Sequence, residues 1–211
     1  GEMSYFIENI FICLAAPFLI AAVILGRGKK SYIFIVSGML ACIVSAYLNT
    51  FFSSLYNAGS IAATMEITPV IEETVKLLPL IFYIAVFEPD SGSAAEAAVH
   101  TAVGFATFEN ICCLLQNGTD NLFYLLVRGC STGAMHIVCA FITGYGLKLA
   151  ERMPKIMAAS VAGLLCMAIT YHAVFNMLMG AGGAVAYVGY AVPLATLAAG
   201  TAARRHLRDK I

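Results

Sequence analysis

Thr68-Pro69-Val70-Ile71-Glu72-Glu73-Thr74-Val75-Lys76-Leu77-Leu78-Pro79 is the stretch from which the rest of the chain is interpreted. It places two adjacent carboxylates and a lysine inside an apolar segment that is long enough to cross a bilayer. A charge near the centre of a membrane helix costs roughly 2.5–3.5 kcal/mol on insertion scales. We therefore interpret Glu72 and Glu73 as the anchors of a polar site inside the membrane.

The composition indicates an integral membrane protein of the all-α class. The chain has 211 residues, of which 61% are hydrophobic and 11% are charged, whereas about 25% of the residues of a soluble domain are charged. The net charge is zero, so the chain shows no sign of a nucleic-acid partner. We expect residues 1–211 to form a single membrane-embedded domain surrounded by lipid.

Apolar runs of about 20 residues predict a polytopic bundle of about seven transmembrane helices. The expected spans are 5–25, 32–56, 67–87, 94–116, 131–150, 156–179 and 184–203. Residues 121–127 are expected to lie at the membrane interface, with Arg128 snorkelling to the boundary. A polar loop is expected at 57–64. Thr68 should cap the third span, with Pro69 in its first turn, and the Ser93/Glu96 spacing predicts a capping box for the fourth.

The positions of the basic residues predict the orientation. In a bundle of seven spans, ten of the twelve Lys and Arg residues fall on the same side of the membrane. They are Arg27, Lys29, Lys30, Lys148, Arg152, Lys155, Arg204, Arg205, Arg208 and Lys210. The positive-inside rule makes that side cytoplasmic. The expected topology therefore has the N-terminus outside and the C-terminus inside.

Polar residues of four expected helices share one depth. At about 1.5 Å per residue, they lie one to two turns below the outer surface. These candidate site residues are Glu72, Glu73, Glu109, His136, His172 and Asn176. Lys76 follows Glu72 by four residues, so we expect these two to form an ion pair that lowers the cost of insertion. Glu73, turned by about 100°, would face the cavity.

Hydrolysis is the chemistry that such a set of residues favours. A carboxylate beside an imidazole in a pocket of low dielectric constant can take a proton from water. Either Glu72 or Glu73 could be this base, with help from Glu109 or His136. His172 and Asn176 would bind the oxyanion. Glutamate and histidine are also zinc ligands, so a zinc site is the alternative to a mechanism without a cofactor.

Two other classes of function remain open at this point. A small transporter or channel could use buried Glu, His and Lys side chains to relay protons or ions. Such a relay should spread its ionisable groups across the membrane, whereas here they share one layer. A receptor or scaffold without chemistry is the third class.

Four short motifs resemble those of the PrsW family of intramembrane proteases. Glu72-Glu73-Thr-Val-Lys76 is similar to its EExxK motif, and Phe105-Ala-Thr-Phe-Glu109-Asn110 to its FxxxEN motif. Arg128, His136 and Gly144 resemble the third motif. His172-Ala-Val-Phe-Asn176 resembles the fourth. Distant relatives that process CAAX proteins and bacteriocins have a histidine where this chain has Glu109.

The resemblance implies a bacterial intramembrane endopeptidase in the cytoplasmic membrane, with a catalytic core at about residues 66–180. Such an enzyme would cleave a membrane-anchored protein near its extracytoplasmic side in regulated proteolysis. A single-span anti-sigma factor is the type of substrate that the family implies. We favour a glutamic-type mechanism that needs no metal, with a zinc-dependent mechanism as the alternative.

Overall fold

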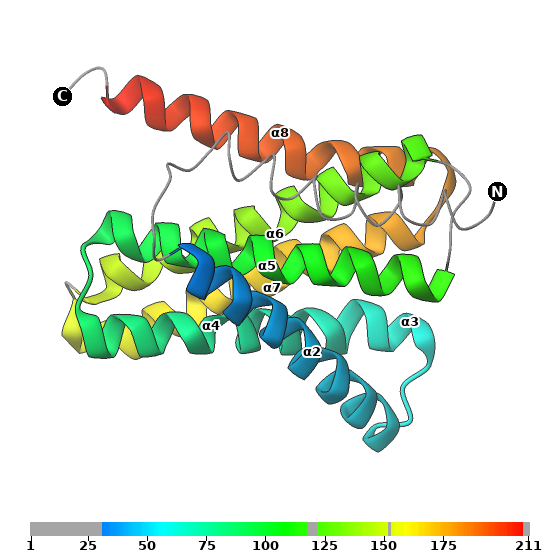
Figure 1. Cartoon of the computed structure of the whole chain (residues 1–211), viewed down its shortest axis with the longest axis horizontal. Helices are drawn as coiled ribbons and strands as arrows, with labels where there is room; N and C mark the ends of the chain where they lie inside the picture. The colour runs from blue at the N-terminus through cyan, green and yellow to red at the C-terminus, as the bar shows by residue number, and fades with distance from the viewer. Residues whose placement is uncertain (1–30, 118–121, 152, 209–211) are drawn as a thin grey trace.

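The described part of the computed structural model is helical throughout, which confirms the expected all-α class. It covers residues 31–117, 122–151 and 153–208, so the expected span 5–25 lies outside it. The elements in chain order are α2 (Ser31–Leu55), α3 (Ser60–Ala62), the π-helix η1 (Ala63–Ile67), α4 (Thr68–Phe87), α5 (Ser91–Asn117), α6 (Leu122–Glu151), the 3₁₀ helix η2 (Pro154–Ile156), α7 (Met157–Gly180) and α8 (Gly183–Arg208). Figure 1 shows α4 to α8 running along the long axis, with α2 crossing them obliquely.

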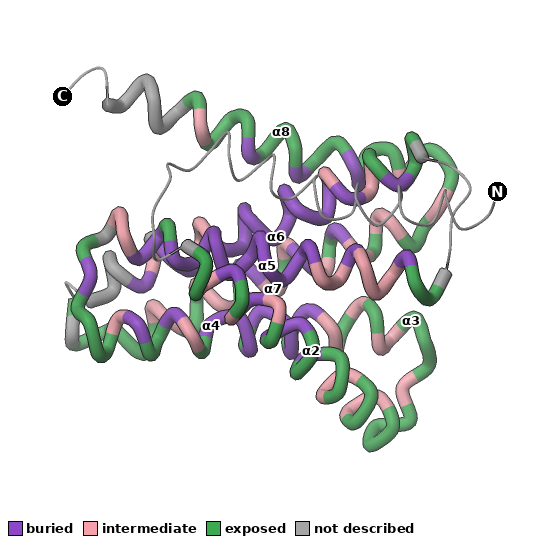
Figure 2. The backbone as a smooth tube through the Cα atoms, viewed as in Figure 1, coloured by how far each residue is buried: buried purple, intermediate pink, exposed green. Residues whose placement is uncertain are grey.

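Helices α5 and α6 form the centre of the bundle. Within the described residues, five helices are long and apolar enough to cross a membrane. The apolar stretches of α5 and α6 are each 67% buried, against 28% for α2, 17% for α7 and 22% for α8. Figure 2 shows the same contrast between a buried centre and exposed outer helices. Since the exposed side chains of α2, α7 and α8 are largely apolar, these outer helices present a surface suited to lipid.

Helix α4 is not among these five helices, although it has 20 residues. It carries Glu72, Glu73 and Lys76, and all three side chains are buried against neighbouring helices. The protein therefore shields these polar groups from the surface. This is where intramembrane ionisable groups are normally found.

Two glycines allow α2 to cross α5 in close contact. A Cβ atom on Gly38 would lie 2.0 Å from the carbonyl oxygen of Thr101, and one on Gly104 would lie 1.9 Å from that of Ile35. Both distances are far below van der Waals contact, so only glycine fits at either position. Close packing of this kind, through small residues, is a common way for membrane helices to associate.

The start of α4 differs from the expectation. The polar loop expected at 57–64 is short, because α3 begins at Ser60 and continues through the π-helix η1 into α4. Thr68 therefore has a helical residue before it and makes no side-chain cap, so the expected cap is wrong. Pro69 does lie in the first turn, where its missing N–H costs nothing. A single π-turn inside a helix often marks a functional site.

The start of α5 is also different. Asp90, not Ser93, caps this helix: its Oδ1 accepts hydrogen bonds from the backbone N–H groups of Gly92 at 2.8 Å and Ser93 at 3.1 Å. The hydroxyl of Ser93 donates to Oδ2 of Asp90 at 2.6 Å. The expected Ser93/Glu96 capping box is therefore wrong. The cap lies one residue before Ser91, where α5 begins.

Helix α6 runs without interruption from Leu122 to Glu151. Residues 122–127 thus belong to the same helix as the expected fifth span and are not a separate segment. Arg128 is half-buried, and its Nη1 donates to Oδ1 of Asn110 at 3.0 Å. The guanidinium is therefore held against α5, and its expected position at the membrane boundary stays a prediction.

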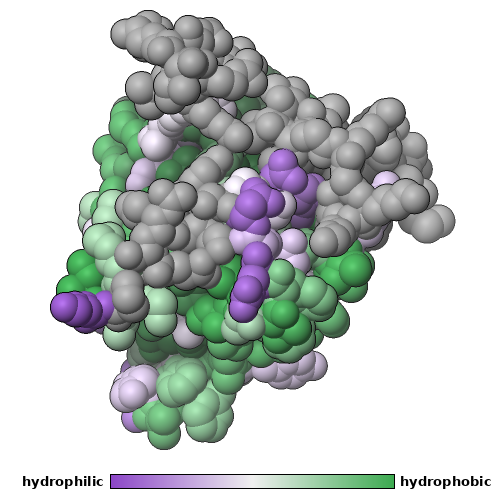
Figure 3. All heavy atoms as spheres, turned by 90° about the vertical axis from the view of Figure 1, so that its left-hand side faces the viewer, coloured by the Kyte–Doolittle hydropathy of each residue, from purple (hydrophilic) through white to green (hydrophobic). Residues whose placement is uncertain are grey.

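One end of the bundle presents hydrophilic side chains. Figure 3 views the end of the molecule at which α4 joins α5 and α6 joins α7. Hydrophilic side chains form a narrow band there, with hydrophobic side chains around it. This distribution suits a bundle whose helix ends reach water and whose sides face lipid.

Candidate active site

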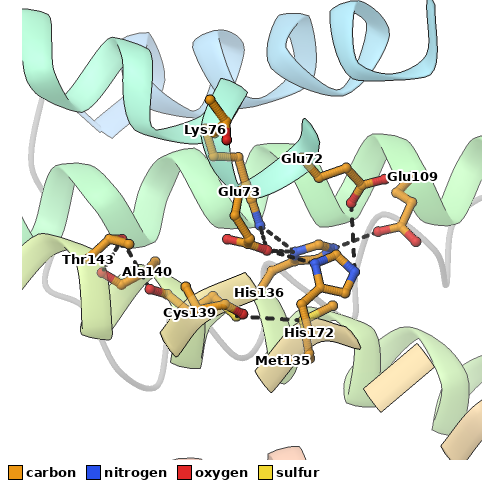
Figure 4. A network of polar contacts seen from close by, with 12 residues as sticks. Glu72, Glu73, Lys76, Glu109, Met135, His136, Cys139, Ala140, Thr143 and His172 are labelled. Carbon is orange, nitrogen blue, oxygen red and sulfur yellow. Dashed lines mark hydrogen bonds and ion pairs between the residues drawn. The ribbon is translucent and has the colours of Figure 1, made fainter. Parts of the chain in front are cut away.

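Five ionisable side chains from four helices meet in the middle of the bundle (Figure 4). Helix α4 supplies Glu72 and Glu73, α5 supplies Glu109, α6 supplies His136 and α7 supplies His172. Four of them are buried, while Glu109 is half-buried, with 28% of its side chain exposed. Five of the six residues expected to share one layer therefore meet, whereas the amide of Asn176 donates to the backbone of Thr64.

Glu73 is the centre of the polar network. Its Oε1 accepts a hydrogen bond from Nζ of Lys76 at 2.7 Å and one from Nδ1 of His172, also at 2.7 Å. The expected ion pair between Lys76 and Glu72 is thus wrong, since Lys76 pairs with the residue three positions before it. Both spacings bring side chains together on a helix, and only the pairing with Glu73 leaves the Lys76 ammonium beside the histidines.

His172 is oriented by this contact. A carboxylate only accepts hydrogen bonds, so Nδ1 of His172 donates to Glu73 and Nε2 is the ring nitrogen left for a ligand. That Nε2 lies 3.9 Å from Oε2 of Glu72, which is too far for a hydrogen bond. Glu73 therefore turns the reactive nitrogen of His172 toward Glu72. An imidazole fixed by a carboxylate in this way is typical of catalytic and metal-binding histidines.

His136 is hydrogen-bonded through both ring nitrogens. Its Nδ1 lies 2.7 Å from Nζ of Lys76, and its Nε2 lies 2.6 Å from Oε2 of Glu109. A charged lysine only donates, so Nδ1 accepts and Nε2 carries the hydrogen that it donates to Glu109. Lys76 thus contacts both Glu73 and His136, a role that its position in the sequence did not reveal.

Glu72 is the one site carboxylate with an unpartnered buried oxygen. Among the described residues, its Oε2 has no hydrogen-bond partner, and such a group is costly in a low-dielectric interior. One ligand atom each from Glu72, His136 and His172 lies within 4.8 Å of the other two. One carboxylate and two imidazoles form a typical donor set for zinc.

These three residues fit a divalent cation, and the carboxylate of Glu73 behind His172 is the support that metal-bound imidazoles usually have. His136 would exchange one of its two hydrogen bonds for the ion. The unpartnered oxygen of Glu72 would gain a partner.

An open cleft of about 310 Å³ leads to this cluster. Its lining includes Glu109 and His172 from the cluster, together with Arg128, Thr132 and Asn176. The Nδ2 atom of Asn176 donates to the backbone carbonyl of Thr64 in η1, at 2.9 Å. The structure therefore brings Asn176 to the cleft but commits part of its amide to the π-helix.

A family model described as PrsW family intramembrane metalloprotease matches residues 28–199. The chain belongs to the PrsW family. No curated protein and no solved structure matches it. The matched range covers α2 to α7 and most of α8, so it contains all of the polar network. This protein is thus a member of a family of intramembrane proteases.

The geometry gives a physical reason for two of the motifs that resemble those of the PrsW family. In the EExxK motif, the lysine pairs with the second glutamate and leaves the first, Glu72, open to a ligand. In the FxxxEN motif, the ring of Phe105 packs on that of His136 with centroids 5.1 Å apart. Glu109 accepts a hydrogen bond from His136, and Asn110 accepts one from Arg128.

Two polar residues near the site have structural roles in this PrsW protein. Asn110 is buried and holds the side chain of Arg128 against α5. His100 contacts the backbone carbonyl of Glu96 in its own helix at 2.7 Å. Neither residue belongs to the cluster around Glu73.

The sequence did not single out Thr132 or Thr64. Thr132 precedes His136 by four residues and so lies on the same face of α6. This spacing was the one available signal. Nothing in the sequence around Thr64 pointed to its contact with Asn176, because the two are 112 residues apart.

Proposed function

We propose that this PrsW family protein is an endopeptidase. It would hydrolyse a peptide bond of a membrane-anchored protein inside the cleft that Glu109 lines. The observation that carries the proposal is an unpartnered carboxylate oxygen that faces an imidazole nitrogen. Oε2 of Glu72 has no hydrogen-bond partner among the described residues. Nε2 of His172 faces it at 3.9 Å, held by Glu73. A carboxylate oxygen and an imidazole nitrogen that face each other in this way are suited to a ligand that both atoms share.

We infer that the shared ligand is a divalent cation such as zinc, bound by Glu72, His136 and His172. Such an ion supplies Lewis-acid chemistry, which polarises a carbonyl and activates water. The donor set and the orphan oxygen of Glu72 support the zinc-dependent mechanism over the glutamic type that the sequence favoured.

Glu109 is the best placed residue to carry protons. It is the only one of the site carboxylates that lines the cleft, and the Nε2–H of His136 fixes its Oε2. Glu109 would take a proton from the attacking water and return it to the leaving nitrogen as the C–N bond breaks. The products are a new carboxylate and a new amine, as peptide hydrolysis requires.

The other residues prepare the site. Glu73 orients His172, and Lys76 neutralises Glu73. To hold the ion through Nδ1, His136 would give up its contact with Lys76 and keep the hydrogen bond from its Nε2–H to Glu109. Asn176 is a positioning residue in this proposal, since its amide supports η1 next to the start of α4. The elements that supply these side chains all fall within the proposed catalytic core, at about residues 66–180.

The substrate is proposed to be a membrane-anchored protein, with a single-span anti-sigma factor as the type that the family resemblance supports. The proposed setting is a bacterial cytoplasmic membrane, with cleavage near the extracytoplasmic side. The apolar outer surfaces of α2, α7 and α8 support a location in the bilayer.

The metal content and the cleavage activity of purified variants test this proposal together. Wild-type protein in detergent should contain about one divalent ion per chain and cleave a single-span reporter. Glu72→Gln and His172→Ala should lose both the ion and the activity. Glu109→Gln should keep the ion and lose cleavage by a factor of about 100 or more. His100→Gln, a matched substitution of another buried histidine, should keep both.

Each part of the proposal has its own contradicting result. Full cleavage by Glu109→Gln would exclude its role as the proton carrier. Undiminished cleavage by metal-free protein in the presence of a chelator would exclude the zinc-dependent mechanism and leave the glutamic type. A wild-type protein that cleaves no reporter in a broad set would count against proteolysis itself.

A further inference from the structure

One face of α6 carries three polar side chains at regular intervals. Arg128, Thr132 and His136 are four residues apart, so they lie in a row on the same side of the helix. His136 belongs to the polar network, while Thr132 and Arg128 line the cleft that leads to it. The row therefore runs from the cluster out along one wall of the cleft.

Thr132 presents an unused hydroxyl to this cleft. The residue is only 2% exposed. Buried threonines elsewhere in the bundle satisfy their hydroxyls on the carbonyl four residues earlier, as Thr101 and Thr107 do. In the described part of the protein, Oγ1 of Thr132 has no hydrogen-bond partner. Because Thr132 lines the cleft, this hydroxyl is open to a ligand there.

Arg128 brings a positioned cation to the same wall. Its Nη1 is fixed by Oδ1 of Asn110 at 3.0 Å, and Asn110 is itself fully buried. A guanidinium has five N–H donors in a planar fork that matches a carboxylate. Because one donor already anchors the side chain, the others can bind an acidic group without first ordering the arginine. Among the described residues that line this cleft, Arg128 is the only Lys or Arg.

The spacing along α6 sets the distance between the cleaved peptide bond and the substrate residue that Arg128 can reach. At 1.5 Å per residue, Thr132 lies about 6 Å and Arg128 about 12 Å along the helix axis from His136. An extended peptide advances about 3.3 Å per residue. A carboxylate that reaches Arg128 would therefore belong to a residue about three or four positions from the peptide bond beside His136.

We propose that the Arg128–Thr132 face of α6 is the substrate-binding wall, and that it selects an extended peptide with an acidic side chain three or four residues from the scissile bond. Thr132 donates to a backbone carbonyl next to that bond, and Arg128 binds the substrate carboxylate. The acidic residue lies toward the end of the bundle at which α6 begins. This inference rests on the proposed proteolytic function and adds the substrate class.

A charge-swap experiment tests the role of Arg128. The probes are single-span reporter proteins in which Asp, Ala or Lys is scanned through the five positions on either side of the cleaved bond. Wild type should favour Asp over Ala by about 10- to 100-fold in kcat/KM at one or two adjacent positions, the gain expected from a hydrogen bond to a charged group. Arg128→Gln should lose this preference, Arg128→Lys should keep part of it, and Arg128→Glu should favour Lys at the same positions.

Thr132 is tested with a pair of conservative variants. Thr132→Val removes the hydroxyl at nearly constant shape and should lower kcat/KM by about tenfold or more for all reporters alike. Thr132→Ser should restore most of the activity. Thermal unfolding and metal content should stay at wild-type levels in both variants, because the hydroxyl has no partner within the described protein.

The results separate this inference from the proteolytic function. If wild type cleaves the reporters with no charge preference, or if Arg128→Gln keeps the same preference, the acidic substrate class is wrong while proteolysis stands. Full activity of Thr132→Val would exclude its hydroxyl from substrate binding. If no reporter is cleaved by wild type, the proposed function fails, and the substrate-binding wall fails with it.

Discussion

Nδ1 of His172 lies 2.7 Å from Oε1 of Glu73, and this contact decides which nitrogen of the imidazole can reach a ligand. With the hydrogen on Nδ1, the lone pair of Nε2 faces Glu72. The second glutamate of the pair is thus a supporting group, and the first is the one open to a ligand. This division of labour between adjacent glutamates underlies the proposed site.

The ion pair between Glu73 and Lys76 should behave as a coupled unit. Glu73→Gln leaves the ammonium of Lys76 buried without a counter-charge, and Lys76→Met leaves Glu73 with His172 as its main partner. Each change should lower the free energy of unfolding by about 3–5 kcal/mol. The double variant should be considerably more stable than the sum of the two losses suggests, because no uncompensated charge remains buried.

Chemical unfolding of the four proteins in detergent would measure this coupling. Cleavage should stay absent in the double variant even where stability returns, since His172 has then lost its orienting carboxylate. Strictly additive losses of stability would contradict the buried ion pair at 2.7 Å.

Asn176→Ala should distinguish a positioning role from an oxyanion role. Removal of an oxyanion donor costs a factor of about 10² to 10³ in kcat. Removal of the hydrogen bond to the carbonyl of Thr64 costs about 0.5–1.5 kcal/mol of stability. We expect a small loss of thermal stability and a fall in kcat of less than tenfold. A 1000-fold fall in kcat with unchanged stability would restore the oxyanion role that the sequence suggested.

Gly104→Ala should destabilise the contact between α2 and α5. The added Cβ would lie 1.9 Å from the carbonyl oxygen of Ile35, so the helices must separate, at a cost of about 1–3 kcal/mol. Gly163→Ala in α7 is the matched control, because nothing lies within 4 Å of the added atom. That control should be neutral or stabilising by up to about 1 kcal/mol. Equal thermal unfolding temperatures for the two variants would contradict the close crossing.

The cap of α5 should make stability depend on pH. Hydrogen bonds from Ser93 lower the pKa of Asp90 below its ordinary value in the folded protein. The cap therefore contributes in full above the ordinary carboxyl pKa, and its contribution is lost as the pH falls through the lower, folded-state pKa. Wild type should unfold at a higher temperature than Asp90→Ala at neutral pH, and the difference should shrink in acid.

Asp90→Asn is the control for this titration, because asparagine also caps helices but does not ionise. It should retain much of the stability at neutral pH. Its difference from Asp90→Ala should not change as the pH falls. A pH-independent difference between wild type and Asp90→Ala would contradict the capping role of the carboxylate.

The helices and the layer of ionisable residues could both be predicted from the sequence. Apolar runs predicted helices, and the structure begins and ends α2, α4, α7 and α8 near the expected bounds, apart from the longer C-terminal part of α8. Charged residues in hydrocarbon are costly, so Glu72, Glu73, Glu109, His136 and His172 could be expected to converge. Depth along each helix, which depends on residue number alone, was enough to place them in one layer.

The sequence could not decide between ion-pair partners or helix caps of nearly equal energy. A lysine can pair with a glutamate three or four residues before it, and Lys76 pairs with Glu73 because His136 and His172 lie on that side. Asp90 and Ser93 are both good caps, and the backbone at the start of α5 selected Asp90.

Residue type and spacing alone predict a membrane bundle with buried ionisable groups at one depth, because the cost of burial and the helical rise depend on nothing else. Which atoms of those groups are paired and which are open depends on how the helices pack. That choice depends on side chains from four different helices, such as His172 and Glu73, which are 99 residues apart. The unpartnered oxygen of Glu72 and the cleft beside Arg128 and Thr132 exist only once those helices are packed together.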